Sequence, residues 1–199
     1  MSKKVKSIIR KIIYLILFSL IIFAFIYLSD KYAERSERKV MTFNDYYQSI
    51  DKTKRYDVIK SNTLIKYLKG DDNKYIIFIG SHTSAWSTEY AKLVTEVFDE
   101  LNIKNIKYYN LNSDKAQKNA NYYELKDLLK GSLTSTDGSE NNLLAPSLYI
   151  IEDGEVKYYN IDTVAMKNTI TPEKYWTEEQ IAEFKAEISA AIDKYYLNN

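Results

Sequence analysis

The chain has 199 residues, of which 45% are hydrophobic and 28% charged, so it suits one globular domain with an appendage. Its net charge of +1 is unevenly distributed, because residues 1–28 hold five basic and no acidic side chains, which leaves 23 basic and 27 acidic residues elsewhere. A body of net charge −4 lacks the clustered positive charge of a nucleic-acid surface. The lack of cysteine excludes disulfides and thiolate metal sites, and the single histidine excludes a histidine-rich zinc site.

The N-terminal residues predict a membrane anchor. A basic segment, residues 1–11, precedes residues 12–28, which are seventeen residues without a charged side chain. At about 1.5 Å per residue, a helix of this run and the apolar residues just before it is long enough for a hydrocarbon core of about 30 Å. A cleaved signal peptide also begins with basic residues, but its apolar region is only about 7–15 residues long and ends in small side chains. Here the run ends in the bulky Tyr27 and Leu28, so we favour an uncleaved anchor.

The basic residues also orient this anchor. Positive side chains concentrate on the cytoplasmic side of membrane proteins, and segment 1–11 has five of them without a compensating acid. We therefore expect the N-terminus in the cytoplasm and the protein body outside the cell membrane. Residues 29–55 are charged and polar with scattered aromatic residues, and we interpret them as a stalk or linker before a domain at residues 56–199.

The body alternates short β-rich runs with helical patterns. Short apolar runs bounded by turn residues predict buried strands, and apolar residues spaced by three and four predict helices. The predicted strands are residues 56–59, 75–79, 106–111, 143–151 and 156–161. The first predicted helix is capped by Ser61 or Asn62 and ended by Gly70, and the last begins with a capping box from Thr177 to Gln180. Two further helices are predicted from their apolar residues, which are Tyr90, Leu93, Val94, Val97, Phe98 and Leu101 in one and Tyr122, Leu125, Leu128 and Leu129 in the other. Asp153-Gly154 predicts a hairpin between the last two strands, and residues 132–142 have the composition of a loop.

The turn after the second strand is the candidate site. Residues 81–87 are Ser-His-Thr-Ser-Ala-Trp-Ser, with two serines spaced S-x-x-S at Ser84 and Ser87. Ser84 is placed to cap the next helix, which puts Ser87 in its first turn. His82 beside Ser84 suggests the base and hydroxyl of a serine hydrolase, but the G-x-S-x-G elbow is missing and a third group would have to orient the base. We therefore interpret His82 as a surface loop residue.

The body, residues 56–197, resembles the thioredoxin family on three features. Ser84 and Ser87 stand at the position and spacing of that family's C-x-x-C cysteines. Ala145-Pro146 precedes a strand, an Asp-Gly turn and a further strand, as the family's cis-proline does. A terminal amphipathic helix is the third feature.

The resemblance implies an α/β, thioredoxin-like fold, with a central mixed sheet flanked by helices, behind an N-terminal transmembrane helix. Among thioredoxin-like families, a signal-anchored extracytoplasmic protein is most similar to the bacteriocin-accessory type of Gram-positive bacteria.

The chain departs from the family at the reactive positions. Thiol–disulfide exchange needs a thiolate that attacks a disulfide, and a chain without cysteine cannot supply one. The buried acid of the family falls at Phe78 here, and the tryptophan before its first cysteine is replaced by Thr83. Either the sulfurs were lost naturally and the scaffold now binds a partner, or Ser84 and Ser87 replace the cysteines of an oxidoreductase. The sequence leaves both possibilities open.

The expected function follows from the groove of the family. There the cis-proline loop offers backbone groups to an extended peptide, a form of strand addition that needs no sulfur. Trp86, Ala145 and Pro146 are then the candidate binding residues, and Tyr175 and Trp176 are interpreted as core or staple residues. We expect a membrane-anchored extracytoplasmic protein, redox-inactive as written, that binds a protein or peptide client but no nucleic acid, metal ion or cofactor.

Two alternatives remain. The first is a thiol-disulfide oxidoreductase whose cysteines were replaced by Ser84 and Ser87. The second is a structural subunit of a membrane export or envelope assembly.

Overall fold

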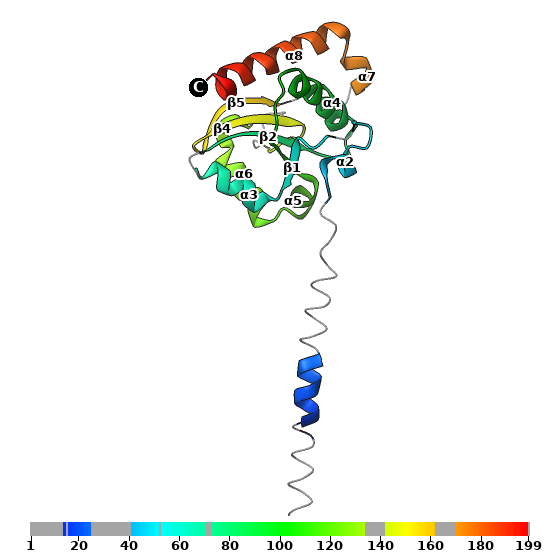
Figure 1. The fold of residues 1–199 in the computed structure, drawn as a ribbon, viewed down its shortest axis with the longest axis vertical. Coiled ribbons are helices and arrows are strands. Elements are labelled where there is room, and N and C mark those ends of the chain that lie inside the picture. Colours follow the sequence, from blue (N-terminus) through cyan, green and yellow to red (C-terminus); the bar gives the residue numbers. More distant parts are fainter. Residues whose placement is uncertain are drawn as a thin grey trace, which may run out of the picture. The chain divides into compact units, whose positions relative to one another are not determined.

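The computed structural model describes residue 14 and residues 16–24, 41–51, 53–70, 73–133, 142–161 and 170–198. The chain divides into two compact units, Met1–Val40 and Met41–Asn199 (Figure 1). In the first unit, residues 16–24 are helical and their apolar side chains are exposed. Among the described residues, no helix is both long enough and apolar enough to cross a membrane. Both ends of the predicted anchor at residues 12–28, like segments 1–11 and 29–40, lie outside the described residues.

The second unit is built on a five-stranded mixed sheet in the order β1-β3-β2-β4-β5. β3 pairs with β1 and β2 in parallel, whereas β4 pairs with β2 and β5 in antiparallel fashion. The strands are β1 (Tyr56–Ile59), β2 (Lys74–Gly80), β3 (Ile106–Asn110), β4 (Ser147–Glu152) and β5 (Glu155–Ile161). The predicted central mixed sheet is confirmed and each predicted strand forms, except that β3 ends at Asn110 and β4 begins only at Ser147, after Pro146.

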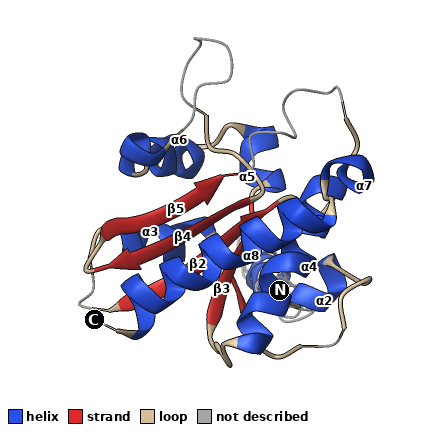
Figure 2. Cartoon of the chain, turned by 90° about the horizontal axis from the view of Figure 1, so that it is seen from above, coloured by secondary structure: helices blue, strands red, loops and turns tan. Residues whose placement is uncertain are grey.

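Helices cover both faces of this sheet, as Figures 1 and 2 show. The helices are α2 (Phe43–Tyr46), α3 (Ser61–Leu68), α4 (Ala85–Glu100), α5 (Asn112–Gln117), α6 (Ala120–Leu128), α7 (Pro172–Tyr175) and α8 (Glu178–Ile192), with short helical turns at Lys130–Ser132 and Asp193–Leu197. Successive side chains of a strand point to opposite faces, so Ile76 and Phe78 of β2 join a core cluster with α2, α4 and α8. Ile77 and Ile79 join a second cluster with α3 and α6. The fold is therefore a three-layer α/β sandwich.

The predicted linker reached too far along the chain. Residues 41–55 belong to the second unit, and Phe43, Tyr47 and Ile50 are buried in the core beside α4 and α8. The Phe43 ring stacks on Tyr56 of β1, with ring centroids 3.6 Å apart. A linker at residues 41–55 is therefore wrong, because the aromatic residues of this segment complete the core rather than face solvent.

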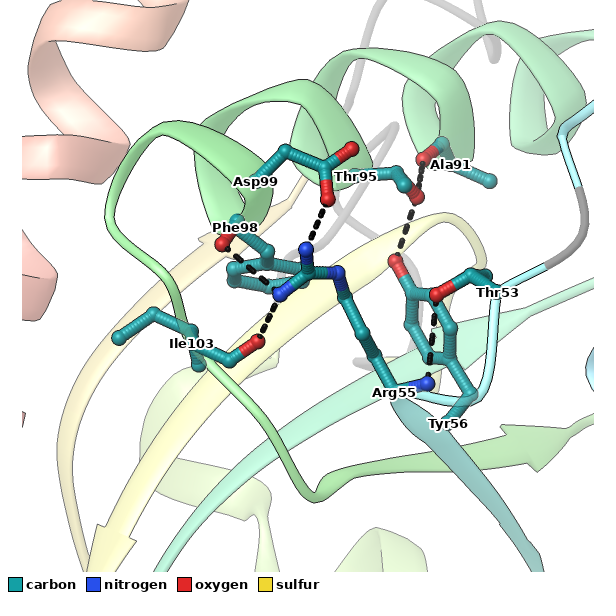
Figure 3. A network of polar contacts seen from close by, with 8 residues as sticks. All are labelled: Thr53, Arg55, Tyr56, Ala91, Thr95, Phe98, Asp99 and Ile103. Carbon is teal, nitrogen blue, oxygen red and sulfur yellow. Dashed lines mark hydrogen bonds and ion pairs between the residues drawn. The ribbon is translucent and has the colours of Figure 1, made fainter.

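The C-terminal end of α4 is fixed by a polar network around Arg55, drawn in Figure 3. Arg55 Nη1 donates to the carbonyl oxygens of Ile103 at 2.6 Å and Phe98 at 3.4 Å, and Nη2 pairs with Asp99. The last carbonyl groups of a helix lack partners within the helix, and a guanidinium group satisfies both their hydrogen bonds and the negative end of the helix dipole. Arg55 thus ties the segment before β1 to the end of α4.

Turns and caps follow the sequence with one exception. Asp153 and Gly154 both have positive φ, 52° and 81°, as a two-residue hairpin turn requires, and the capping box from Thr177 to Gln180 is formed. The predicted cap of α3 is wrong, because Lys60 occupies the N-cap position without a side-chain bond. Ser61 lies in the first turn instead, where its hydroxyl accepts a hydrogen bond from Asn121 at 2.9 Å. Most of the predicted loop at residues 132–142 lies outside the described residues.

Candidate functional site

The turn at residues 81–84 connects the central strand β2 to α4. Ser84 is the N-cap of α4, and its hydroxyl accepts a hydrogen bond from the backbone amide of Ser87 at 3.5 Å. Its carbonyl oxygen accepts the first helical bond from Thr88 at 3.1 Å. Both the predicted cap and the predicted position of Ser87 in the first turn are confirmed. Ser84 remains partly exposed, whereas Ser87 is fully buried.

The buried Ser87 hydroxyl stabilises the turn from the interior of the domain. It accepts a hydrogen bond from the backbone amide of Ser81 at 3.1 Å, and it lies beside the phenol of Tyr47. Tyr47 also accepts a hydrogen bond from the hydroxyl of Tyr108 at 3.4 Å. Burial raises the pKa of Tyr47 above its ordinary value, and the hydrogen bonds to Tyr108 and Ser87 only partly oppose this rise. These phenols therefore stay neutral at physiological pH and act as hydrogen-bonding groups.

Phe78 occupies the place of the buried acid in the thioredoxin comparison. Its ring is fully buried and stacks on Tyr90, with centroids 5.8 Å apart and an interplanar angle of 12°. An aromatic ring can neither take up nor release a proton. Position 78 is thus part of the hydrophobic core.

The sheet register brings the Pro146 loop to the same edge of the sheet as the turn. Ile79 of β2 pairs with Ser147 of β4, so Pro146 precedes β4 at the end where β2 leads into residues 81–84. The peptide bond between Ala145 and Pro146 is cis, as the resemblance implied. Ser147 Oγ donates to the Leu144 carbonyl oxygen at 2.9 Å and stabilises this loop. Among the described residues, the backbone of Ala145 has no hydrogen-bond partner, and its side chain is partly exposed.

Aromatic residues of α4 and α7 form the apolar side of the site. The Trp86 ring lies 5.6 Å from the Tyr175 ring, and Tyr175 in turn lies 4.9 Å from Trp176. Trp176 contacts Phe184 of α8 at 5.2 Å and packs against the core, as predicted. Tyr175, predicted as a core or staple residue, instead extends the partly exposed surface of Trp86. The sequence could not indicate this pairing, because α4 and α7 are far apart in the chain.

Polar residues at the end of β3 form the other side of the site. Asn110 pairs with Gly80 in the parallel register, which places Asn110 and the following Asn112 beside the turn. The amide nitrogen of Asn110 lies 3.0 Å from His82 Nδ1, and that of Asn112 donates to Thr83 Oγ1 at 2.8 Å. Sequence reasoning did not identify either asparagine. Both follow directly after a strand that runs parallel to β2. Since the carboxyl ends of neighbouring parallel strands meet at one edge of the sheet, this position could have indicated that they lie beside the turn.

The site lacks the geometry of a serine hydrolase. His82 is exposed, as predicted for a loop residue, but its Nδ1 faces Asn110. In the described part of the chain, no hydrogen bond joins the imidazole to Ser84 or Ser87. No group of three or more histidine or acidic side chains suited to a metal ion occurs among the described residues.

Comparisons with known proteins find a likeness among solved structures alone. No protein-family model matches the chain, and no curated protein matches its sequence significantly. Among solved structures, the chain is similar to oxidised thioredoxin O2 from Arabidopsis thaliana, with 11% identity, a TM-score of 0.35, and 62% of this chain and 96% of that chain covered. Oxidised mitochondrial thioredoxin 3 from Saccharomyces cerevisiae has 12% identity and a TM-score of 0.34, covering 63% and 96%. A putative oxidoreductase with a thioredoxin fold has 12% identity and a TM-score of 0.35, covering 62% and 96%.

These identities and TM-scores are low, so the likeness carries no argument about fold or activity. The thioredoxin-like description of the second unit rests instead on its strand order, its mixed parallel and antiparallel pairing, and the helices on both faces.

Proposed function

We propose that the chain is a membrane-anchored, extracytoplasmic thioredoxin-like protein that binds an extended segment of a client protein and performs no thiol–disulfide exchange. The observation that carries this proposal is the meeting of three features at one edge of the sheet. They are the turn that ends in Ser84, the loop of Ala145 and Pro146, and the aromatic pair of Trp86 and Tyr175. We call the surface that they border the turn groove.

The chemistry of these features suits an extended peptide. The backbone groups of Ala145, which have no hydrogen-bond partner among the described residues, offer main-chain hydrogen bonds, which give affinity in strand addition. Trp86 and Tyr175 offer partly exposed aromatic surface, the kind of residue that dominates binding interfaces. None of these contributions needs a sulfur atom, and the chain has no cysteine.

Trp86 provides a direct test of client binding. The chain contains two tryptophans, so a Trp176→Phe variant of the full chain in detergent leaves Trp86 as the only indole reporter. Peptides would be selected from a displayed library of random linear sequences of about 12 residues, and each would be titrated against Trp86 fluorescence. We expect selected peptides to shift the emission to the blue as the indole leaves water.

Substitutions then assign the binding surface. Trp86→Ala should raise Kd at least about tenfold, measured by anisotropy of a labelled peptide, because a central aromatic anchor commonly contributes that much. Tyr123→Ala is the matched control, because Tyr123 is an exposed tyrosine of α6 that belongs to the other face of the sheet. Equal affinity of the wild type, the Trp86 variant and the control for every selected peptide would contradict the proposal.

The oxidoreductase alternative is favoured by one observation, the place of Ser84 and Ser87 at the start of α4. A Ser84→Cys/Ser87→Cys double variant tests it, because cysteines at a helix N-terminus can have a lowered pKa. We expect this variant, with Phe78 beneath the turn, to reduce 5,5′-dithiobis(2-nitrobenzoic acid) no faster than dithiothreitol at equal thiol concentration. A much faster rate would show that the site is built for exchange and that binding alone is not its function.

The anchor requires its own experiment. Residues 12–28 carry no charge, and the helical residues 16–24 expose their apolar side chains. The full chain should therefore stay in the membrane pellet after alkaline carbonate extraction, and protease added outside intact cells should digest the second unit. A chain found in the carbonate supernatant, or protected from external protease, would overturn the anchored and extracytoplasmic parts of the proposal.

A further inference from the structure

His82 is held in place by side chains from three separate elements although it is exposed. Asn110, at the end of β3, brings its amide nitrogen to 3.0 Å from His82 Nδ1. Asn112 of α5 brings a second amide nitrogen to 3.4 Å from the same atom. The ring of Tyr46 of α2 lies 5.2 Å from the imidazole, at an interplanar angle of 53°. The ring is thus fixed in position and in orientation.

The hydrogen bonds around Asn110 determine which imidazole nitrogen carries the hydrogen. The side-chain oxygen of Asn110 accepts a hydrogen bond from the backbone amide of Asn112 at 3.3 Å. This assigns the nitrogen of the Asn110 amide, which can only donate, to His82. His82 Nδ1 is then the acceptor, and Nε2 carries the hydrogen on the far side of the ring. The structure therefore offers one N–H donor of fixed orientation at the molecular surface.

The position of this donor connects it with the turn groove. His82 follows Ile79 by three residues, Ala145 precedes Ser147 by two, and Ile79 and Ser147 are partners in the register of β2 and β4. His82 and Ala145 therefore both lie close to the same end of one strand pair. Trp86 is four residues beyond His82, on the side of the turn that contacts α7.

Fixing an exposed side chain costs conformational entropy, and a group fixed before binding loses less on binding. We infer that His82 is a further binding residue of the turn groove, whose Nε2–H donates to a main-chain carbonyl oxygen of the bound client segment. This inference rests on the proposed peptide binding. Asn110, Asn112 and Tyr46 are positioning residues in this arrangement, since each acts on the client only through the imidazole.

Two substitutions separate hydrogen bonding from packing. His82→Phe keeps an aromatic ring against Tyr46 but removes both nitrogen atoms, whereas His82→Gln removes the ring but keeps an N–H donor. With a peptide selected on the wild-type full chain, we expect His82→Phe to raise Kd about three- to tenfold, the loss of one neutral hydrogen bond. His82→Gln should stay within about twofold of the wild type, because a donor remains. Equal loss in both variants, or no loss in His82→Phe, would overturn the inference.

The client can be altered as well, which excludes a purely structural role for His82. Ester bonds placed one at a time along the selected peptide each weaken one carbonyl acceptor and remove one N–H donor. On the wild type, one ester position should weaken binding more than it does on His82→Phe, so that the two changes are coupled at that carbonyl alone. A loss on His82→Phe that is the same at every ester position would assign His82 to the structure of the turn and overturn the inference.

The same titrations distinguish failure of the His82 inference from failure of the proposed client binding on which it rests. Binding that depends on Trp86 but not on His82 would leave the client groove intact and remove only the role of His82. Selected peptides that bind the wild type and Trp86→Ala equally would overturn both.

Discussion

The phenol of Tyr47 lies directly against Gly80, the last residue of β2, and leaves no room for a side chain there. A Cβ atom at Gly80 would overlap the Tyr47 hydroxyl and lie 2.9 Å from a ring carbon of Tyr108 and 3.1 Å from one of Phe78. Glycine at this position therefore permits an aromatic cluster to pack beneath the turn. The segment before β1, which supplies Tyr47, thus packs on the interior side of the candidate site.

Gly80→Ala should consequently destabilise the protein by about 1–3 kcal/mol, the usual cost of inserting a methyl group into a packed core. Gly131→Ala is the matched control, because a Cβ at Gly131 would meet no atom of the described residues within 4 Å. Both changes reduce the freedom of the unfolded chain in the same way, so their difference isolates the overlap. Urea unfolding monitored by circular dichroism measures both free energies of unfolding.

A Tyr47→Phe substitution tests the cause of that effect. It removes the hydroxyl that is nearest to a Cβ at Gly80. In a double-mutant cycle, Gly80→Ala should cost at least about 0.5 kcal/mol less in the Tyr47→Phe background than in the wild type. Additive costs would mean that the Tyr47 hydroxyl is not what excludes a side chain from position 80.

Arg55 provides a second prediction, at the other end of α4. Arg55→Lys keeps the charge but loses the fork that reaches the carbonyl oxygens of Phe98 and Ile103 and the carboxylate of Asp99 together. We expect a loss of about 1–2 kcal/mol in urea unfolding, because the Ile103 carbonyl oxygen loses the short hydrogen bond from Arg55, whereas the Phe98 carbonyl oxygen keeps its bond from the Ile103 amide. Lys130→Gln, which removes an ion pair whose side chains are 77% and 80% exposed, should change stability by less than about 0.5 kcal/mol. Equal losses of stability in the two variants would show that Arg55 contributes no more than an exposed surface charge.

Much of the fold is predictable from the sequence because its elements have strong local patterns. The apolar run of β2, the one-sided face of α4 and the Asp153-Gly154 turn each determine their structure within a short window. α2 has a weaker local signal, a capping box from Thr42 to Asp45, and a helix of four residues also needs its packing against Tyr56 and α4.

The backbone segments of the candidate site could be predicted from the sequence, but only some of its side chains could. The turn at residues 81–87 and the loop of Pro146 follow from the order of strands, so their meeting at one edge could be expected. Asn110 and Tyr175 join the site only because β3 and α7 lie beside the turn and α4. Contacts of this kind depend on which elements are neighbours in space, and no local pattern in one sequence contains that information.

Asp114, in the first turn of α5, makes stability depend on pH. Its carboxylate oxygens accept hydrogen bonds from the Tyr109 hydroxyl and the Asn119 amide, both at 2.7 Å. Partial burial opposes ionisation, but the hydrogen bonds from Tyr109, Asn119 and Ser61 outweigh it and lower the pKa of Asp114 below its ordinary value. A carboxylate with a lowered pKa in the folded state stabilises that state above the pKa of the unfolded chain, about 3.9. This stabilisation is lost as the pH falls through the folded pKa.

Asp114→Asn should therefore lower the free energy of unfolding at about pH 7 and leave a smaller difference from the wild type at about pH 3. An uncharged amide has one acceptor atom where the carboxylate has two, so the present arrangement, in which Tyr109 donates to one oxygen and Asn119 to the other, is lost. Urea unfolding across this pH range measures the difference, with Asp127→Asn as the control because that side chain is 80% exposed. A difference between Asp114→Asn and the wild type that stays constant down to about pH 3 would show that the charge of Asp114 does not contribute to folding.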